Sequence, residues 1–399
     1  MTRLPTSDGA CVPCVHRQGP NAIATYYGNP ISFNTLAFMP AVAFASKLGT
    51  RHGFGAGTQD MCNKPAALEA MFGTGQWTIP DFYNTDYLLC IGTNPKVSHW
   101  TMISTHRPMH VLQDITQRGG KVRFINPRRI ESASASTGEL IQIKPDTDVY
   151  LLAAMIHEID RHGGFDQDVI ARHGNRVEEL RSFVARYPAS RVSQVTGIAV
   201  DVIERLAVEF MTAKSAATYM STGANQGRQG ALAYWLLNML SFVTGNLGRK
   251  GGNYYAKGVA PMVAGTPASS DVFFDTPLGE MRHVFGTLPG TLLADFIDVE
   301  QEPIRALIVF SGNPLLSIAG EERLRKAFAK LELIVTLDLY RNATGELADY
   351  VLPATDWLER EDINHLGNGV QPTPYVQYTE AIVQPKAERK NDAWIISRL

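Results

Sequence analysis

Residues 86–100 read DYLLCIGTNPKVSHW, and this stretch decides the fold. The apolar residues 87–91 favour a buried strand, which the turn GTNP (92–95) would end abruptly. Glycine lets the backbone approach a ligand without a Cβ, and proline fixes φ. Because ligands of open α/β sheets bind just past the carboxyl ends of strands, residues 92–98 are candidate binding residues.

The same pattern occurs three times, as ATYYGNPIS at 24–32, LLCIGTNPKVS at 88–98 and LIVFSGNPLLS at 307–317. Each copy reads as a strand, a glycine, an optional spacer residue, Asn-Pro and a nearby serine. The other apolar runs alternate between strand and helix patterns, which is typical of a parallel sheet with helices on both faces. We therefore predict an α/β fold with a rough internal repeat. The alternative is that three unrelated turns share Gly-Asn-Pro by coincidence.

The composition is that of an ordinary globular protein. The chain has 399 residues, 45% hydrophobic and 19% charged, which is too long for one core and predicts two or three lobes. The net charge of -2 and the lack of basic runs argue against a nucleic-acid partner. No apolar run is long enough to span a bilayer, and no secretory leader is visible. With four cysteines and no disulfide framework, we expect a cytoplasmic protein.

Two cysteine patterns are of chemical interest. Cys62 lies just before a helix whose first turn contains Pro65, and a helix amino terminus favours a thiolate. A thiolate there would be a soft metal ligand or a nucleophile; the alternative is a small buried residue. Cys11 and Cys14 form a C-x-x-C pair, which fits half a metal or redox site. Since no second pair follows, we favour two unremarkable thiols.

Polar residues at other predicted strand ends indicate an anionic or polar ligand. Arg128 and Arg129 follow the strand KVRFIN (121–126), where two guanidinium groups suit a phosphate or form a solvated basic turn. Asp148 lies in the first turn of a predicted helix and would support it or recognise the N–H edge of a ligand. The loop STGANQGRQG (221–230) offers backbone N–H groups and side-chain amides.

Seven short motifs occur in a characteristic order along residues 20–395: IGTNPKVSH, RGGKVRFINPRR, KPDTD, STGANQGRQG, VTGNLGRKGG, GNPLLS, and LADYVLPAT with HLGNGVQ. This order resembles the central region of the molybdopterin oxidoreductases of the dimethyl-sulfoxide-reductase and formate-dehydrogenase type. The resemblance implies two Rossmann-like dinucleotide-binding domains, one of residues 1–57 plus 259–399 and one of residues 58–258 inserted into it. It also implies a shared bis-molybdopterin guanine dinucleotide cofactor that carries molybdenum or tungsten.

The resemblance assigns roles to the residues that match the family motifs. The residues implied for one dinucleotide are Gly92, Asn94, Ser98, Pro127, Arg128 and Asp148. Among these, Pro127 and Arg128 would lie near the guanosine end, and Asp148 would read the guanine.

The remaining assignments concern a pterin, the second dinucleotide and the metal. The residues implied near a pterin are Gly223, Asn225, Gln226 and Gly230. Those implied for the second dinucleotide are Gly312, Asn313, Ser317 and Asp338. Cys62 falls where the family places the protein ligand to the metal, so it is the expected metal-binding and catalytic residue.

The sequence departs from the family pattern at several points. Asn126 stands where the family usually has Asp, and Asp146 stands where it usually has Gly. Asn63 follows Cys62, where similar formate dehydrogenases usually carry His, which weakens a formate assignment. The amino-terminal iron–sulfur domain and the carboxy-terminal barrel of the family are not found. We therefore expect electrons to pass to a partner protein, or to a [4Fe–4S] cluster supplied by a missing domain.

We weigh two functions. The first is a molybdenum or tungsten oxidoreductase, a fragment or subunit acting on a small molecule by oxo transfer or formate-type two-electron chemistry. The second is a non-catalytic scaffold subunit of an electron-transfer complex, resembling the large subunit of respiratory NADH dehydrogenases. Cys62 favours the first, because a scaffold needs no soft ligand. A generic nucleotide-binding dehydrogenase is disfavoured, because no G-x-G-x-x-G follows the first strand.

Overall fold

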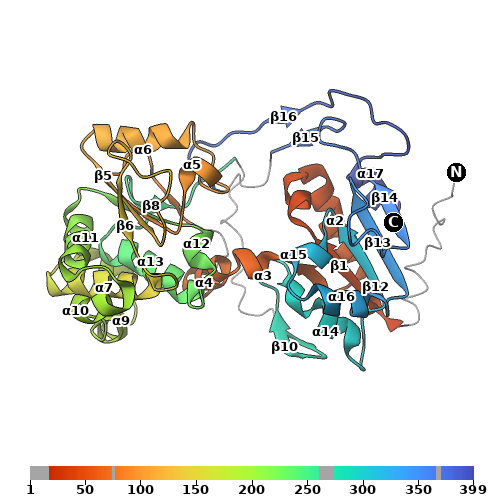
Figure 1. The fold of residues 1–399 in the computed structure, drawn as a ribbon, viewed down its shortest axis with the longest axis horizontal. Helices are drawn as coiled ribbons and strands as arrows, with labels where there is room; N and C mark the ends of the chain where they lie inside the picture. The colour runs from red at the N-terminus through yellow and green to blue at the C-terminus, as the bar shows by residue number, and fades with distance from the viewer. Residues whose placement is uncertain (1–17, 74–76, 260–272, 365–369) are drawn as a thin grey trace. The chain divides into compact units, whose positions relative to one another are not determined.

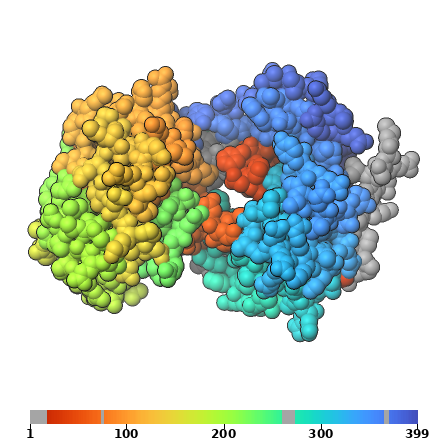
Figure 2. All heavy atoms as spheres, in the orientation of Figure 1, coloured from red at the N-terminus to blue at the C-terminus, as the bar shows by residue number. Residues whose placement is uncertain are grey.

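The computed structural model describes residues 18–73, 77–259, 273–364 and 370–399 (Figure 1). The described chain forms two compact units. Unit 1 contains residues 18–62, 273–364 and 376–399, and unit 2 contains residues 63–73, 77–259 and 370–375. In Figure 2, red atoms of the amino-terminal segment lie beside the cyan and blue atoms of unit 1, whereas unit 2 runs from orange through yellow to green. The units therefore divide after Cys62, not at residue 57, and a short later segment joins unit 2.

Unit 1 is built on a fully parallel sheet of six strands in the order β11-β2-β1-β12-β13-β14. The strands are β1 (Ile23–Tyr27), β2 (Gly53–Gly55), β11 (Leu288–Pro289), β12 (Ala306–Phe310), β13 (Leu333–Asp338) and β14 (Tyr350–Pro353). The longer helices are α2 (Thr35–Leu48), α14 (Leu293–Asp298), α16 (Glu321–Phe328) and α17 (Asp392–Ile396). Short elements are α3 (Gly57–Asp60), α15 (Pro314–Ser317) and the 3-10 turns η1 (Pro20–Ala22), η2 (Asn29–Phe33) and η4 (Gly290–Leu292).

Helices cover both faces of this sheet. The side chains of β12 alternate, so Leu307 and Val309 join the core beneath α14 and α16. Ile308 and Phe310 point the other way, into the core beneath α2 and α17. All five residues of β12 are buried, which explains its continuous apolar sequence. A hairpin of β9 (Phe273–Thr276) and β10 (Gly279–Arg282) and a pair of β15 (Asp362–Ile363) and β16 (Tyr378–Thr379) complete the unit.

Unit 2 contains a smaller parallel sheet of four strands in the order β6-β5-β4-β7. The strands are β4 (Tyr87–Ile91), β5 (Lys121–Asn126), β6 (Glu139–Gln142) and β7 (Ala216–Met220), with an antiparallel pair of β3 (Ile79–Pro80) and β8 (Asn253–Tyr254). The helices before β7 are α4 (Asn63–Phe72), α5 (Pro95–Ser98), α6 (Pro108–Gln117), α7 (Asp148–Arg161), α8 (Gln167–His173), α9 (Val177–Val184), α10 (Ala189–Thr196) and α11 (Val200–Thr212). Those after β7 are α12 (Thr222–Asn225) and α13 (Gly230–Val243).

The predicted strand at 87–91 is β4, and all five of its residues are buried. Leu89 and Ile91 pack with α7, α11 and α13 on one face, while Leu88 and Cys90 pack with α6 on the other. The predicted α/β class, with parallel sheets in a repeated arrangement, is therefore confirmed. Among the described residues, no helix is long and apolar enough to cross a membrane.

Each sheet has a point where the chain changes direction across it. In unit 2 the chain goes from β4 to β5 and β6 on one side and then to β7 on the other. In unit 1 the corresponding neighbours are β12, followed by β13 and β14 on one side, with β1 on the other. Ligands of open α/β sheets bind at the carboxyl edge of such switch points.

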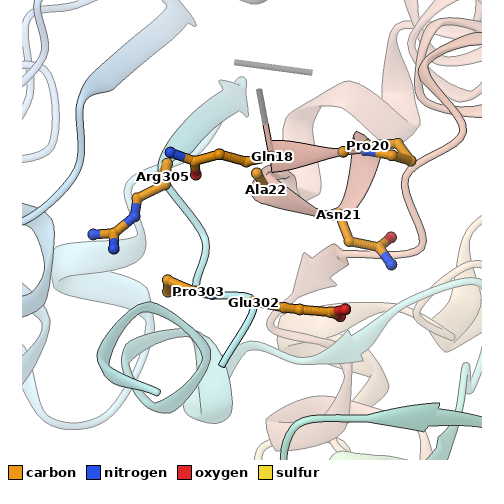
Figure 3. A pocket seen from close by; sticks show the side chains of 8 residues that line it. Gln18, Pro20, Asn21, Ala22, Glu302, Pro303 and Arg305 are labelled. Carbon is orange, nitrogen blue, oxygen red and sulfur yellow. The ribbon is translucent and has the colours of Figure 1, made fainter. Parts of the chain in front are cut away.

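A pocket of about 360 Å³ lies at the opposite, amino edge of the unit 1 sheet. It is lined by residues just before β1 and β12, and Figure 3 shows Asn21, Glu302 and Arg305 around it. None of the residues expected to bind a cofactor lines this pocket. The residues expected to bind a cofactor lie instead at or near the carboxyl edges of the two sheets.

Candidate functional site

Two backbone loops meet at the carboxyl edge of the unit 2 sheet. Gly92 follows β4 with φ of 61°, and its carbonyl oxygen accepts a hydrogen bond from the Gly223 N–H, at 3.1 Å. A Cβ on Gly92 would lie 2.4 Å from the Ala224 nitrogen. Glycine is thus required both by the left-handed φ and by the contact. The loops after β4 and β7 form one continuous polar edge.

Asn94 is fixed within this edge by its neighbours. Its Oδ1 accepts a hydrogen bond from the Ser132 hydroxyl at 2.6 Å, and its Nδ2 donates to Glu131 Oε2 at 2.5 Å. The Ser98 hydroxyl contacts the Asn94 carbonyl oxygen at 3.4 Å. The structure therefore brings together Gly92, Asn94 and Ser98, and it adds Ser132 and Glu131, which sequence reasoning missed.

The carboxyl edge of unit 1 repeats this loop. Asn313 has backbone angles of -130° and 73°, close to the -138° and 80° of Asn94. Its Oδ1 accepts a hydrogen bond from the Thr344 hydroxyl at 2.8 Å, and the Ser317 hydroxyl donates to its carbonyl oxygen at 3.0 Å. The Tyr26 hydroxyl also lies 3.0 Å from the Ser317 Oγ. The two asparagines thus occupy equivalent places.

The structure corrects the predicted alignment of these loops. In the loop after β12, the residue with positive φ is Ser311, at 49°, which corresponds to Gly92 in the loop after β4. Gly312 therefore occupies the place of Thr93, and the two loops have the same length, with no spacer. A Cβ on Gly28, after β1, would lie 1.9 Å from the Ser311 carbonyl oxygen, so a glycine is needed at this crossing as well.

The first Asn-Pro copy is not a third version of this loop. Gly28 has φ of -74°, and residues 29–33 form the 3-10 turn η2 instead of a short α-helix. Because β1 lies beside β12, this segment corresponds in position to the loop after β7. The prediction of three equivalent turns is therefore wrong, and the repeat is twofold.

The strand beside each asparagine loop is β5, next to β4 in unit 2, and β13, next to β12 in unit 1. These two strands end in different residues. Asn126 ends β5 and donates to the Thr93 carbonyl oxygen at 3.3 Å. Asp338 ends β13 and accepts hydrogen bonds from the Tyr340 N–H at 3.1 Å and from Asn342 Nδ2 at 3.0 Å. Burial raises the pKa of Asp338 above its ordinary value. The two edges thus differ in charge at equivalent positions.

The loop after β5 carries the predicted anion-binding residues. Pro127 directly follows the strand, and its carbonyl oxygen accepts a hydrogen bond from Gln142 Nε2 at 3.3 Å. The Arg128 side chain is largely exposed, and its Nη1 lies 3.6 Å from Glu131 Oε1. Glu131 therefore faces both Arg128 and Asn94, and hydrogen bonds to its own backbone N–H and to Asn94 lower the pKa of its carboxyl group.

Asp148 is the first residue of α7 and is only 9% exposed. Burial raises the pKa of its carboxyl group to about 6, and the nearby charge of Asp146 acts in the same direction. Asp146 has φ of 64°, a conformation that favours the glycine usual in the family. Its carboxylate accepts hydrogen bonds from the Arg228 backbone N–H and Nε, both at 2.9 Å. Asp146, where the family usually has Gly, therefore stabilises the loop after β7.

That loop contains the residues expected near a pterin. Gly223 and Gln226 are exposed, whereas Asn225 is fully buried. The Asn225 carbonyl oxygen accepts a hydrogen bond from Asn63 Nδ2 at 2.7 Å. A Cβ on Gly230 would lie 1.9 Å from that same oxygen, so the loop is closed at its base by backbone contact.

Cys62 belongs to unit 1 and is only 6% exposed. Its backbone N–H donates to the Gly57 carbonyl oxygen at 3.0 Å, and its Sγ lies 3.9 Å from the Val284 carbonyl oxygen. Gln59 Nε2 in the preceding turn donates to the Ser317 carbonyl oxygen at 3.1 Å. The cysteine turn is therefore tied to the Asn313 loop. Cys11 and Cys14, and residues 365–369 of HLGNGVQ, lie outside the described residues.

A family model described as molybdopterin oxidoreductase matches residues 12–399. The chain belongs to this family. The suspected resemblance is thereby confirmed, and the family relatives are molybdopterin-dependent oxidoreductases. The chain of this molybdopterin oxidoreductase spans about half the length of the curated relatives it matches.

Three comparisons illustrate the family. The chain is 28% identical to the F420-dependent formate dehydrogenase subunit alpha of Methanocaldococcus jannaschii, covering 83% of this chain and 50% of that one. It is 28% identical to formate dehydrogenase H of Escherichia coli, covering 84% and 48%. The structure of acetylene hydratase from Pelobacter acetylenicus matches with a TM-score of 0.76 and 20% identity, over 96% of this chain and 56% of that chain, and supports the fold.

The residues of this molybdopterin oxidoreductase fit the cofactor that its family implies. Cys62 offers a thiol, the kind of ligand that a soft metal site takes. At Gly92 and at Gly28, the backbones of two loops at a carboxyl edge approach each other so closely that a Cβ would clash with the neighbouring loop. Asp148 is a buried carboxylate at a helix start, suited to accept hydrogen bonds from N–H donors.

Proposed function

We propose that this chain is the cofactor-binding part of an oxidoreductase that uses a bis-molybdopterin guanine dinucleotide with molybdenum or tungsten. The observation that supports this most directly is that the Asn94 loop of unit 2 and the Asn313 loop of unit 1 have equivalent conformations, so each unit would offer one edge to a nucleotide. When bound, such a cofactor supplies oxygen-atom or hydride-equivalent transfer at its metal.

The chain's own residues have distinct parts in this proposal. Asn94 and Ser98 in unit 2, and Asn313 and Ser317 in unit 1, would orient the two nucleotides through side-chain and backbone donors. Arg128 would neutralise part of the charge near one guanosine end. Asp148 would accept hydrogen bonds from the guanine N–H groups of one nucleotide. Asp338 would help to hold the second nucleotide.

Cys62 would bind the metal as a thiolate. Its low exposure keeps bulk water away from the sulfur, and the hydrogen bond of Gln59 to the Ser317 carbonyl oxygen fixes its turn beside one nucleotide edge. A small-molecule substrate would be oxidised or reduced by oxo transfer or formate-type chemistry. The electrons would pass to a partner protein or to a [4Fe–4S] cluster outside this chain.

The proposal is tested by purifying the chain from a host that makes the cofactor and measuring molybdenum, tungsten and acid-released GMP together. We expect about two GMP per metal, as a bis-dinucleotide cofactor requires. Cys62→Ala should lower the metal content while leaving GMP largely in place, and Cys90→Ala serves as a buried-thiol control. A chain that holds neither metal nor GMP, also when supplied with the rest of the family's domains, would instead indicate the scaffold function.

A further inference from the structure

A hydroxyl group holds the loop asparagine at both edges. Ser132 lies six residues after the end of β5, and Thr344 lies six residues after the end of β13. Their hydroxyls donate to Oδ1 of Asn94 at 2.6 Å and to Oδ1 of Asn313 at 2.8 Å. The same pairing therefore occurs twice, in loops whose surrounding sequences differ.

The surrounding hydrogen bonds fix the direction of each pairing. The Lys96 N–H donates to Ser132 Oγ at 2.9 Å, and the Leu315 N–H lies 3.4 Å from Thr344 Oγ1. In unit 2 the Glu131 carboxylate can only accept, so it faces Asn94 Nδ2, and the Ser132 hydroxyl must donate to Oδ1 at the other end of the amide. The Thr344 backbone N–H also donates to Asn313 Oδ1, at 3.2 Å. An atom that receives two donors must be the carbonyl oxygen, so the Nδ2 donor is the other end of the amide.

The partner of Asn94 Nδ2 shows what this donor suits. In unit 2 it faces the Glu131 carboxylate, which also lies near Arg128. A negative oxygen thus sits where an asparagine amide and a guanidinium converge. In unit 1 the residue before the hydroxyl is Ala343, so no carboxylate occupies the equivalent position in the sequence. A negatively charged ligand oxygen would therefore suit the Nδ2 donor of Asn94 and the Nδ2 donor of Asn313.

We propose that Ser132 and Thr344 are positioning residues that orient the amides of Asn94 and Asn313, so that each Nδ2 donates to an anionic oxygen of a bound guanine nucleotide. This inference rests on the proposed function. Neither hydroxyl needs to touch the nucleotide. Without the hydroxyl the amide can rotate, and it loses the fixed direction that makes its hydrogen bond effective.

The test uses the full chain, with calorimetric titration of GDP and measurement of retained GMP. We expect Ser132→Ala to weaken one of two GDP-binding events about tenfold, as expected for loss of one oriented hydrogen bond, and to leave the other unchanged. Thr344→Val should weaken the other event. Ser132→Thr and Thr344→Ser keep the hydroxyl and should bind GDP within about twofold of the unchanged chain.

Two controls separate positioning from a merely structural role. Thr85 in unit 2 and Thr50 in unit 1 also have hydroxyls that donate to backbone carbonyl oxygens, at 2.8 and 2.6 Å, of the first residues of β4 and β1 at the amino edges of the sheets. Thr85→Val and Thr50→Val should lower the melting temperature without changing GDP affinity. Combining Ser132→Ala with Asn94→Ala should weaken GDP binding no more than Asn94→Ala alone, because the hydroxyl acts through the amide.

The outcomes distinguish the inference from the proposed function. If the unchanged chain neither retains GMP nor binds GDP, the proposed function fails, and the inference fails with it. If it binds GDP and Ser132→Ala binds equally well, only the inference is overturned. Additive losses in the double variant would likewise overturn it, since they would show that Ser132 acts independently of Asn94.

Discussion

The buried carboxyl group of Asp148 lowers the free energy of unfolding when it is ionised, and a bound ligand could offset this loss. Its carboxyl group is buried at the start of α7, and the described structure gives it a raised pKa instead of a cationic partner. Burial of an acid favours the protonated form, so the charged form destabilises the folded chain. N–H donors from a bound base would relieve this cost, which is why a buried acid at a ligand edge is informative.

The pH dependence of stability tests this reading of Asp148. The pKa rises from 3.8 to about 6 on folding, so stability from this group is present below pH 4 and lost as pH rises through 6. We expect Asp148→Asn to stabilise the nucleotide-free chain by about 3 kcal/mol at pH 7.5, and to make almost no difference near pH 3, below both pKa values. Urea unfolding at the two pH values measures this, and a less stable variant at pH 7.5 would contradict it.

At the same scale, the sequence could predict some site residues and not others. Asn94 and Asn313 follow strongly apolar strands and precede proline, so the strand end marks them. Ser132 lies in the stretch ESASASTG (131–138), which reads as an ordinary polar loop. Its importance comes from a contact with a residue thirty-eight positions earlier, and no local pattern encodes that contact.

At the scale of elements, each edge depends on two loops that touch through backbone. The loop after β4 and the loop after β7 leave no room for a Cβ at Gly92. The sequence predicted the glycine and the strand before it, because apolar β4 stops abruptly. It did not predict the alignment of the unit 1 loop, because Ser311 adopts the left-handed conformation that a glycine was expected to supply.

A matched pair of glycines tests the crossing. Gly92→Ala and Gly119→Ala both place a side chain at positive φ, which costs about 1–2 kcal/mol. Only at Gly92 would the Cβ meet another loop, since nothing lies within 4 Å of the position at Gly119. We expect Gly92→Ala to destabilise the chain by at least 1 kcal/mol more and to abolish one GDP-binding event. Equal effects on unfolding would show that the loops do not need this contact.

At the scale of the molecule, each unit has its own cores. The buried clusters of unit 1 and of unit 2 share no residues, and each unit has helices on both faces of its sheet. The sequence predicted this α/β organisation from alternating apolar runs. It did not locate the division after Cys62, because no proline- or glycine-rich linker marks that position and the boundary depends on which sheet each segment joins.

Matched core substitutions test this separation. Ile308 in β12 and Leu89 in β4 are both fully buried at the centre of their sheets. We expect Ile308→Ala and Leu89→Ala each to cost about 2–5 kcal/mol in the unit that contains it. Hydrogen exchange should then show faster opening in the strands of that unit alone. Uniform loss of protection throughout both units would instead indicate a single cooperative structure.

The discontinuous sheet of unit 1 has a consequence for synthesis on the ribosome. The chain emerges amino terminus first, and β1 pairs with β2 on one side and with β12, Ala306–Phe310, on the other. All four strands of the unit 2 sheet are translated in between. Unit 2 can therefore complete its sheet while one edge of β1 still lacks its native neighbour. Nascent chains would pass through a stage in which that apolar edge needs protection from aggregation.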